Sequence, residues 1–141
     1  MNDVWGLVKH RNGVWDWTTP QPSDDYNPVG RFQHMVCFMG TKLVIVGGRT
    51  NDPEEKISSI EIYDTETAEW ERVGPFSRYR HALAVQGDKL FIHGGFEPEY
   101  ISQPLETMTI LDMSNFNMKH GNELSSTKIT PMIPQNLLNG R

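Results

Sequence analysis

RFQHMVCFMGTKLVIVGG, the sequence of residues 31–48, closely matches RYRHALAVQGDKLFIHGG, the sequence of residues 78–95. The two stretches begin 47 residues apart and align without a gap. A third motif keeps nearly the same register, because Ile62-Tyr63-Asp64 recurs 48 residues later as Ile110-Leu111-Asp112. Periods of about 40–50 residues built from short apolar runs are typical of β-propellers, in which each repeat forms one four-stranded blade. The sequence therefore predicts a repeat protein of the all-β class.

Short apolar runs separated by turn residues predict hairpins along the chain. Asn12-Gly13 lies between two such runs and is a strong signal, because both residues tolerate the positive φ of a tight turn. Gly40-Thr41 and Gly87-Asp88 separate further pairs of runs. The predicted strand pairs are 4–9 with 14–18, 35–39 with 43–46, 57–63 with 68–73, 82–86 with 90–93, and 107–112 with a weaker run at 116–119.

The hydrophobic pattern within these runs predicts the order of strands in a blade. Residues 35–39 and 43–46 are continuously apolar, which predicts burial on both faces. Residues 61–63 and 69–71 alternate between charged and apolar side chains. We therefore expect the later strands to turn one face to water, so that each blade has two inner strands followed by two outer ones.

The repeated motifs resemble the kelch repeat, which combines Arg-x-x-His, a short hairpin, Gly-Gly, Tyr-Asp and a Trp seven residues after the Tyr. Residues 31–73 carry the whole motif, and residues 78–118 carry most of it, with Leu111 in place of the Tyr and Met118 in place of the Trp. The motif residues are Arg31, His34, Gly47, Gly48, Tyr63, Asp64 and Trp70 in the first repeat and Arg78, His81, Gly94 and Gly95 in the second. Residues 3–18 resemble the outer half of an earlier unit. The resemblance implies a kelch β-propeller segment of about two and a half four-stranded antiparallel blades.

A narrower resemblance links residues 6–17, 31–34, 80–82 and 87–95 to the kelch region of the plant and protist serine/threonine protein phosphatases with N-terminal kelch-like domains. It implies a non-catalytic, regulatory segment of a hydrolase. The dinuclear metal centre of such an enzyme would belong to a phosphatase domain outside this segment, and we expect no cofactor within it. Residues 119–141 are polar and contain Pro131 and Pro134, so we expect a linker or a disordered tail there.

Composition limits the classes of partner. The net charge of −5 and the pI near 5.5 leave no basic surface for nucleic acid. Cys37 is the single cysteine, which excludes an internal disulfide and suits a reducing compartment. No apolar run approaches the roughly 20 residues that cross a bilayer. We therefore expect a cytoplasmic or nuclear location and no membrane partner.

The Gly-Gly pairs have a structural and a functional interpretation. Glycine is needed where φ is positive or where a neighbouring blade leaves no room for a Cβ atom. A phosphate-binding loop would instead need a following helix and a Lys-Ser/Thr pair, and residues 49–53 supply neither. We interpret both pairs as structural.

The histidines and tryptophans also favour structural roles. His34 and His81 occupy equivalent repeat positions, and the other three histidines share no metal-ligand spacing with them. We expect these two side chains to hydrogen-bond the connections between blades. Aromatic side chains on the outer strands are expected to bury area between adjacent blades, namely Tyr63 and Trp70 in the first repeat and Trp5, Trp15 and Trp17 in the partial unit.

Binding residues are expected in the loops 49–58 and 96–106, since loops on a rigid scaffold carry most recognition. The candidate partner-binding residues are Arg49, Arg80, Phe96 and Tyr100. The leading hypothesis is a protein-interaction module of a serine/threonine phosphatase. The alternatives are a substrate adaptor of a ubiquitin-ligase complex and, less favoured, a propeller metalloenzyme. Propellers close with about four to eight blades, so we also expect the remaining blades to be supplied by a longer chain or a second fragment.

Overall fold

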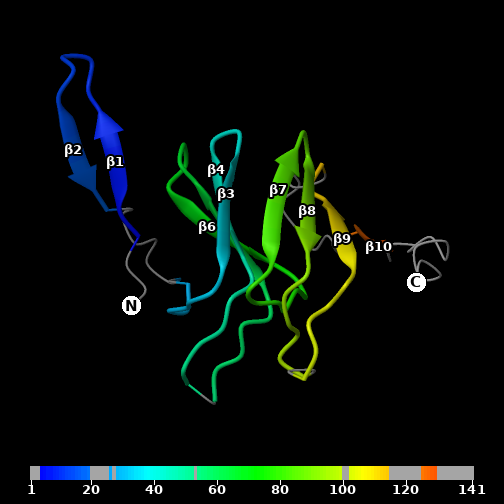
Figure 1. Ribbon diagram of the computed structural model, residues 1–141. Helices are drawn as coiled ribbons and strands as arrows, with labels where there is room; N and C mark the ends of the chain where they lie inside the picture. Colours follow the sequence, from blue (N-terminus) through cyan, green and yellow to red (C-terminus); the bar gives the residue numbers. More distant parts are fainter. Residues whose placement is uncertain are drawn as a thin grey trace, which may run out of the picture.

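A computed structural model describes residues 4–19, 26, 28–52, 54–99, 102–114 and 125–129 of the 141-residue chain. Over these residues the chain forms ten antiparallel strands and no helix (Figure 1). The strands are β1 Gly6–Lys9, β2 Trp15–Thr18, β3 Met35–Met39, β4 Lys42–Val46, β5 Ile60–Asp64, β6 Glu69–Val73, β7 Ala82–Gln86, β8 Lys89–His93, β9 Met108–Asp112 and β10 Ser125–Ile129. The predicted all-β class is confirmed.

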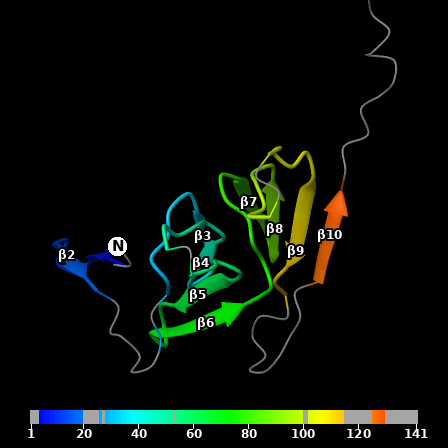
Figure 2. The same ribbon diagram turned by 90° about the horizontal axis from the view of Figure 1, so that it is seen from below.

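The strands are organised as two blades and a separate hairpin. β3-β4-β5-β6 form one four-stranded sheet, β7-β8-β9-β10 form a second, and β1 pairs with β2 alone. Figure 2 shows each blade running in sequence order away from the place where β3 and β7 lie next to each other. The hairpin stands apart from both blades in the two views (Figures 1 and 2). This is the arrangement expected of a partial kelch β-propeller with β3 and β7 as its innermost strands.

The hydrophobic core lies between the two blades. The buried core side chains are Val44, Val46, Ile60, Ile62, Val73 and Phe76 from the first blade and the connection after it, and Leu90, Ile92, Leu111 and Met113 from the second blade. Burying one aliphatic side chain of this size contributes about 1.5–3 kcal/mol relative to leaving it in water. Contact between the blades therefore stabilises both of them.

The innermost strand β3 differs from its prediction. Its residues were expected to be buried on both faces, but Val36 is 45% exposed and Phe38 is 63% exposed. These two side chains lie on the face of β3 that no other described strand covers, whereas Cys37 and Met39 pack against the core. A continuous apolar run therefore indicates a strand but not which neighbours cover it.

The third strand β5 differs in the opposite direction. The alternation around Glu61 predicted a water-facing side, yet Glu61 is 0% exposed. The strand is buried on both faces because it lies inside its sheet between β4 and β6 and because the charge of Glu61 is paired. The predicted alternation does occur in β6, the outermost strand of this blade.

The β1–β2 hairpin does not bury its aromatic side chains between blades, as the sequence had suggested. Trp5, Trp15 and Trp17 are 61%, 55% and 69% exposed. The hairpin pairs Gly6–Lys9 with Trp15–Thr18 around a turn in which Gly13 has a φ of 84°. Among the described residues, β1 and β2 pair only with each other, so the predicted interface between blades is not formed by them.

The fourth strand of the second blade comes later than expected. β10 pairs with β9, opposite Met108–Asp112, and lies inside the range predicted to be a tail. The weaker run proposed at 116–119 lies outside the described residues. An outermost strand pairs on one side only and needs little apolar character, so the polar sequence of residues 125–129 gave a poor signal.

Candidate functional site

The Gly-Gly pair after β4 lies against the connection that leads from the first blade to the second. Gly48 donates its backbone N–H to the carbonyl oxygen of Arg78 at 2.7 Å. A Cβ atom on Gly47, which has a φ of 61°, would lie 2.0 Å from that same oxygen. In the second blade a Cβ atom on Gly95 would lie 2.5 Å from the carbonyl oxygen of Tyr79. Backbone packed this closely fixes the start of the two loops that follow, residues 49–58 and 96–106, which we call the rim loops.

Arg31 closes the first blade through a buried ion pair. Its guanidinium donates to Val29 O at 3.1 Å, to Gly47 O at 3.2 Å and to Glu61 Oε1 at 3.0 Å. The side chains of Arg31 and Glu61 are 4% and 0% exposed. Ser59 donates its hydroxyl to the same carboxylate oxygen at 2.8 Å. Every buried charge in this group has hydrogen-bonded partners, as stable burial requires.

Arg78, the equivalent residue in the second blade, lacks this set of partners. It is 2% exposed, and its Nε and Nη1 atoms have no hydrogen-bond partner among the described residues. Its Nη2 atom lies 3.7 Å from Glu97 Oε1, which comes from the rim loop after β8. Burial lowers the pKa of Arg78 from its ordinary value, while Glu97 acts in the opposite direction. The second blade therefore connects its buried arginine to a loop instead of to a strand.

Among the described residues, the buried Nδ1 atom of His34 and both ring nitrogens of His81 have no hydrogen-bond partner, so the hydrogen bonds expected from the sequence are not seen. His81 is 5% exposed, and neither of its ring nitrogens has a partner among the described residues. Burial, followed by the nearby Arg78 and His34, lowers the pKa of His81 from 6.5 to about 4, so the ring is neutral at pH 7. The blades are instead joined by backbone, because Arg80 donates its N–H to Gln33 O at 3.1 Å.

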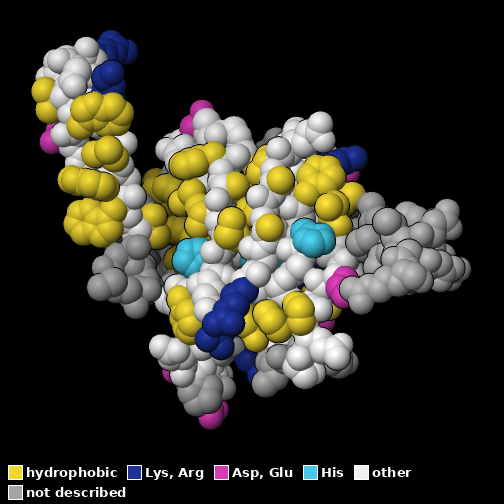
Figure 3. Space-filling view, viewed as in Figure 1, with side chains coloured by type: hydrophobic (Ala, Val, Ile, Leu, Met, Phe, Trp, Pro, Cys, Tyr) yellow, Lys and Arg dark blue, Asp and Glu magenta, His cyan; other side chains and the backbone are white. Residues whose placement is uncertain are grey.

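A ladder of stacked side chains, formed by Phe32, Arg49, Tyr79 and Phe96, runs from one blade to the next. The guanidinium carbon of Arg49 lies 4.9 Å from the ring centre of Phe32 and 5.2 Å from that of Tyr79. Tyr79 in turn stacks on Phe96, with ring centres 5.7 Å apart and planes inclined by 22°. On the face seen in Figure 3, cationic side chains lie among hydrophobic ones next to the histidines.

The ladder is built by equivalent backbone bridges. Phe32 pairs with Arg49 and Tyr79 pairs with Phe96, each across the start of an inner hairpin. The equivalence places Arg49 and Phe96 at the same position in successive repeats. Each stacked cation–aromatic contact contributes about 0.5–1 kcal/mol at an exposed site. The four side chains therefore have defined positions on the rim.

A groove of about 470 Å³ opens beside the ladder, between the two rim loops. It is lined by residues 48–50 and 55–58 of the first loop, by residues 75–77 of the connection between blades, and by residues 97–99 of the second loop. Ile57 and Phe76 are buried below it. Arg49, Glu55 and Glu99 are exposed at its edge. An apolar floor with charged edges is typical of sites that bind a segment of another protein.

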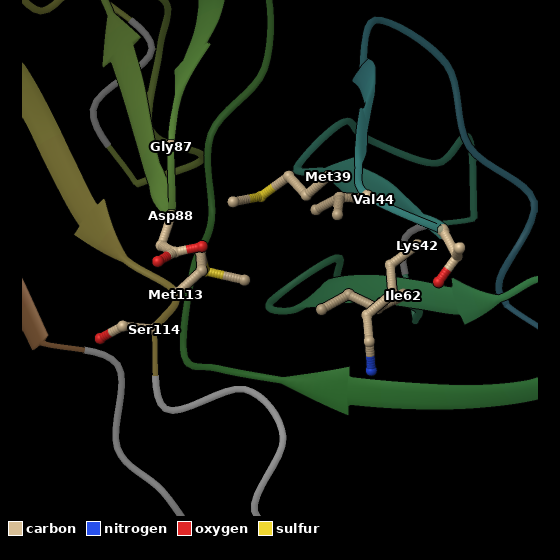
Figure 4. A pocket seen from close by; sticks show the side chains of 10 residues that line it. Met39, Lys42, Val44, Ile62, Gly87, Asp88, Met113 and Ser114 are labelled. Carbon is tan, nitrogen blue, oxygen red and sulfur yellow. The ribbon is translucent and has the colours of Figure 1, made fainter.

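A second pocket of about 290 Å³ lies at the opposite ends of the sheets, between the turns of the inner hairpins. Figure 4 shows Met39, Val44 and Ile62 from the first blade facing Met113 from the second. The charged Lys42 is 3.3 Å from Asp64 in an ion pair. This pocket combines apolar and thioether surface with the polar side chains of Lys42, Asp88 and Ser114 at its edge.

Only two of the four predicted partner-binding residues lie together in the structure. Arg49 and Phe96 belong to the ladder, whereas Arg80 is exposed with a φ of 55° and lies outside both the ladder and the groove. Tyr100 lies outside the described residues. Sequence reasoning missed Phe32 and Tyr79, although an aromatic residue in the second position of both Arg-x-x-His motifs was a visible signal. It also missed Glu97, for which the sequence carries no signal.

Comparison with known proteins places this geometry in a family. The model of the KLHDC2/KLHL20/DRC7 Kelch-repeats domain matches residues 1–135. The chain is 31% identical over 117 residues to serine/threonine-protein phosphatase BSL2 of Arabidopsis thaliana, which covers 65% of this chain and 11% of that protein. It is 29% identical over 108 residues to Kelch repeat and BTB domain-containing protein 12 of Danio rerio, which covers 70% of this chain and 16% of that protein.

The structure titled "Structure of YjhT" has the same fold, with a TM-score of 0.55 at 16% identity over 91% of this chain and 48% of that one. The chain thus spans less than a fifth of the length of either curated relative named above. None of the described residues forms a helix long and apolar enough to cross a membrane. Fold, repeat motifs and family match agree that the chain belongs to the kelch-repeat family, as a KLHDC2/KLHL20/DRC7-type Kelch-repeats domain.

Proposed function

We propose that this chain is the regulatory, non-catalytic kelch segment of a serine/threonine protein phosphatase, and that it binds a protein partner through the two rim loops. The single observation that carries the binding role is the groove between those loops, next to the ladder of Phe32, Arg49, Tyr79 and Phe96. Aromatic and arginine side chains on a rigid frame are the groups that dominate protein interfaces. The similarity to BSL2 supports the phosphatase assignment.

The binding role has a direct test by site-specific cross-linking. A photoreactive amino acid at Glu99, on the edge of the groove, is expected to capture a protein from extract of the source organism. The same amino acid at Asn12, in the exposed turn of the hairpin, serves as the matched control. Capture from both positions at equal yield, or from neither, would argue against the groove as the binding surface.

The phosphatase assignment is tested by the sequence of the whole transcript. We expect a phosphatase catalytic domain with its dinuclear metal ligands in the same polypeptide, and a cytoplasmic or nuclear location on cell fractionation. The second candidate is a substrate adaptor of a ubiquitin ligase, favoured by the similarity to a kelch and BTB protein of Danio rerio. A BTB domain in place of the phosphatase domain would select this alternative.

A further inference from the structure

The pocket between the turns of the inner hairpins is lined by a pair of methionines, one from each blade. Met39 and Met113 point toward each other across it (Figure 4). Val44 and Ile62 line the same pocket, and both are 1% exposed. The pocket volume of about 290 Å³ is just below the range of about 300–1,000 Å³ that is usual for small-molecule sites. The pocket therefore has room for one long side chain of a partner.

Backbone hydrogen bonds hold the frame of this pocket. Met113 donates its N–H to the carbonyl oxygen of Asp88 at 2.8 Å, which ties the end of β9 to the turn between β7 and β8. Thr65 donates its N–H to Thr41 O at 3.1 Å, which ties the turn after β5 to the turn between β3 and β4. Methionine side chains are unbranched and flexible, so they adapt to the shape of what they contact. A fixed frame with an adaptable lining results.

The repeat does not require the two methionines. Met39 aligns with Gln86, 47 residues later, and Met113 aligns with Thr65, 48 residues earlier. The turn glycines, in contrast, recur in both copies as Gly40 and Gly87. The thioether surface is therefore a feature of this one junction between blades, and the framework of the repeat does not account for it.

The edge of the pocket carries an uncompensated negative charge. Lys42 is paired with Asp64 at 3.3 Å, and its ammonium nitrogen lies on the far side of the pocket from Asp88 (Figure 4). The carboxylate of Asp88 is exposed and has no hydrogen-bond or ion-pair partner among the described residues. The next residue, Lys89, lies opposite Asp112 in the pairing of β8 with β9. A cation that enters the pocket would therefore find a free carboxylate beside Met113.

We propose that this pocket binds a lysine or arginine side chain from a segment of a partner protein. The methylene groups of that side chain pack between Met39 and Met113, and its cationic head pairs with the carboxylate of Asp88 at the edge. Lysine and arginine commonly bury their stems along apolar surface while the charged head stays in water. The net charge of −5 adds long-range attraction for a basic segment. The site lies at the opposite ends of the sheets from the rim groove and does not rest on the proposed function.

The experiment titrates four peptides, acetyl-Gly-Gly-X-Gly-Gly-amide with X as lysine, arginine, norleucine or glutamate, into the full chain with ¹³C-labelled methionine methyl groups. Norleucine keeps the unbranched apolar stem of lysine without its charge. The methyl signals of Met39 and Met113 are assigned by their loss in Met39→Leu and Met113→Leu, which nearly conserve volume. We expect the lysine and arginine peptides to shift both signals saturably. The norleucine peptide should bind at least about threefold more weakly, and the glutamate peptide should leave both signals unchanged.

Two variants and a salt series make the test specific. Asp88→Asn should weaken the lysine and arginine peptides to the affinity of the norleucine peptide. Glu71→Gln removes an equal charge from the exposed outer strand β6, away from the pocket, and should leave every affinity unchanged. Added salt should weaken only the charged peptides, because it screens the interaction with an exposed carboxylate. The tighter of the lysine and arginine peptides identifies the preferred head group, and equal affinities identify a site that accepts both.

The proposal is overturned if the norleucine or glutamate peptide binds as tightly as the cationic peptides, or if Asp88→Asn binds them like the wild type. It is also overturned if neither cationic peptide shifts the Met39 and Met113 signals saturably at concentrations up to about 10 mM. Saturable shifts confined to other methionines would place the binding surface elsewhere and reject this pocket. Cross-linking at Glu99 reports on the rim groove alone, so the proposed function stands or fails independently of these titrations.

Discussion

Thr109 takes the place in the second blade that Glu61 holds in the first. Glu61 lies opposite Ile45 in β4, and Thr109 lies opposite the equivalent Ile92 in β8. Both side chains are buried, but the carboxylate of Glu61 accepts hydrogen bonds whereas Thr109 Oγ1 has no partner among the described residues. Both blades have a buried arginine, but the second blade has no carboxylate on the equivalent strand. Its arginine is therefore paired with a carboxylate from a rim loop.

The ion pair of the first blade is expected to be essential for its stability. Glu61→Gln leaves the buried guanidinium of Arg31 without a counter-charge. Breaking a buried pair in this way lowers the free energy of unfolding by about 3–5 kcal/mol. Urea unfolding measures the loss. Glu71→Gln, on the exposed outer strand of the same blade, is the control and should stay within about 0.5 kcal/mol of the wild type. Equal midpoints for the two variants would contradict the assignment.

The hydroxyl of Thr109 is expected to be dispensable. Valine has nearly the same shape, and a buried hydroxyl without a partner carries a desolvation penalty of about 1–3 kcal/mol. Thr109→Val should therefore raise the free energy of unfolding by about 1 kcal/mol. Denaturant unfolding of the variant beside the wild type checks this. A decrease of the same size would show that the hydroxyl has a hydrogen-bond partner, such as a bound water molecule.

The glycine at the blade junction is expected to be irreplaceable for steric reasons. A Cβ atom on Gly47 would lie 2.0 Å from a backbone oxygen, whereas one on Gly40 meets nothing within 4 Å, although both residues have a φ near 60°. Gly40→Ala therefore measures backbone strain alone, about 1 kcal/mol. Gly47→Ala should destabilise the fold by at least about 2 kcal/mol more. Thermal melts with equal midpoints would show that the connection can move aside.

Acid is expected to destabilise the blade junction through His81. Its folded pKa of about 4 lies below the unfolded value of 6.5, so the unfolded chain binds the proton more readily. The contribution of the neutral ring is fully present above pH 6.5 and is lost as pH falls toward 4, by about 3 kcal/mol at most. Unfolding should be measured at several pH values in this window. His81→Gln should show a shallower dependence than the wild type, and parallel curves would contradict the shift.

The exposed hairpin is expected to drive self-association of the isolated chain. Trp15 and Trp17 present large apolar surfaces to water, and exposed apolar patches favour association. Replacing both tryptophans by Ser should lower the weight-average mass in sedimentation at high concentration. The melting temperature of the blades should not change, because the hairpin stands apart from them. A wild-type chain that sediments as a monomer at every concentration would refute this expectation.

The ladder contains two residues that the sequence predicts for the rim loops and two that it does not. Arg49 and Phe96 are candidates from the sequence because they lie in the two long loops and differ between the repeats, which comparison of the two copies shows. Phe32 and Tyr79 complete the ladder, and their contact with Arg49 joins residues from two different blades. Stacking of this kind depends on the distance between the blades. The sequence pattern of a single strand does not predict that distance.

The two blades can be predicted from the sequence alone, because the period near 47 residues, the turn glycines and the apolar runs are properties of short segments and recur in both copies. The burial of Glu61, the exposure of Phe38 and the pairing of Arg78 with a loop follow only from the folded structure. Burial and charge pairing depend on neighbours that are distant in the sequence and that the fold brings together. The arginine of the Arg-x-x-His motif therefore has different partners in the two blades, because the equivalent strand position is Glu61 in the first blade and Thr109 in the second.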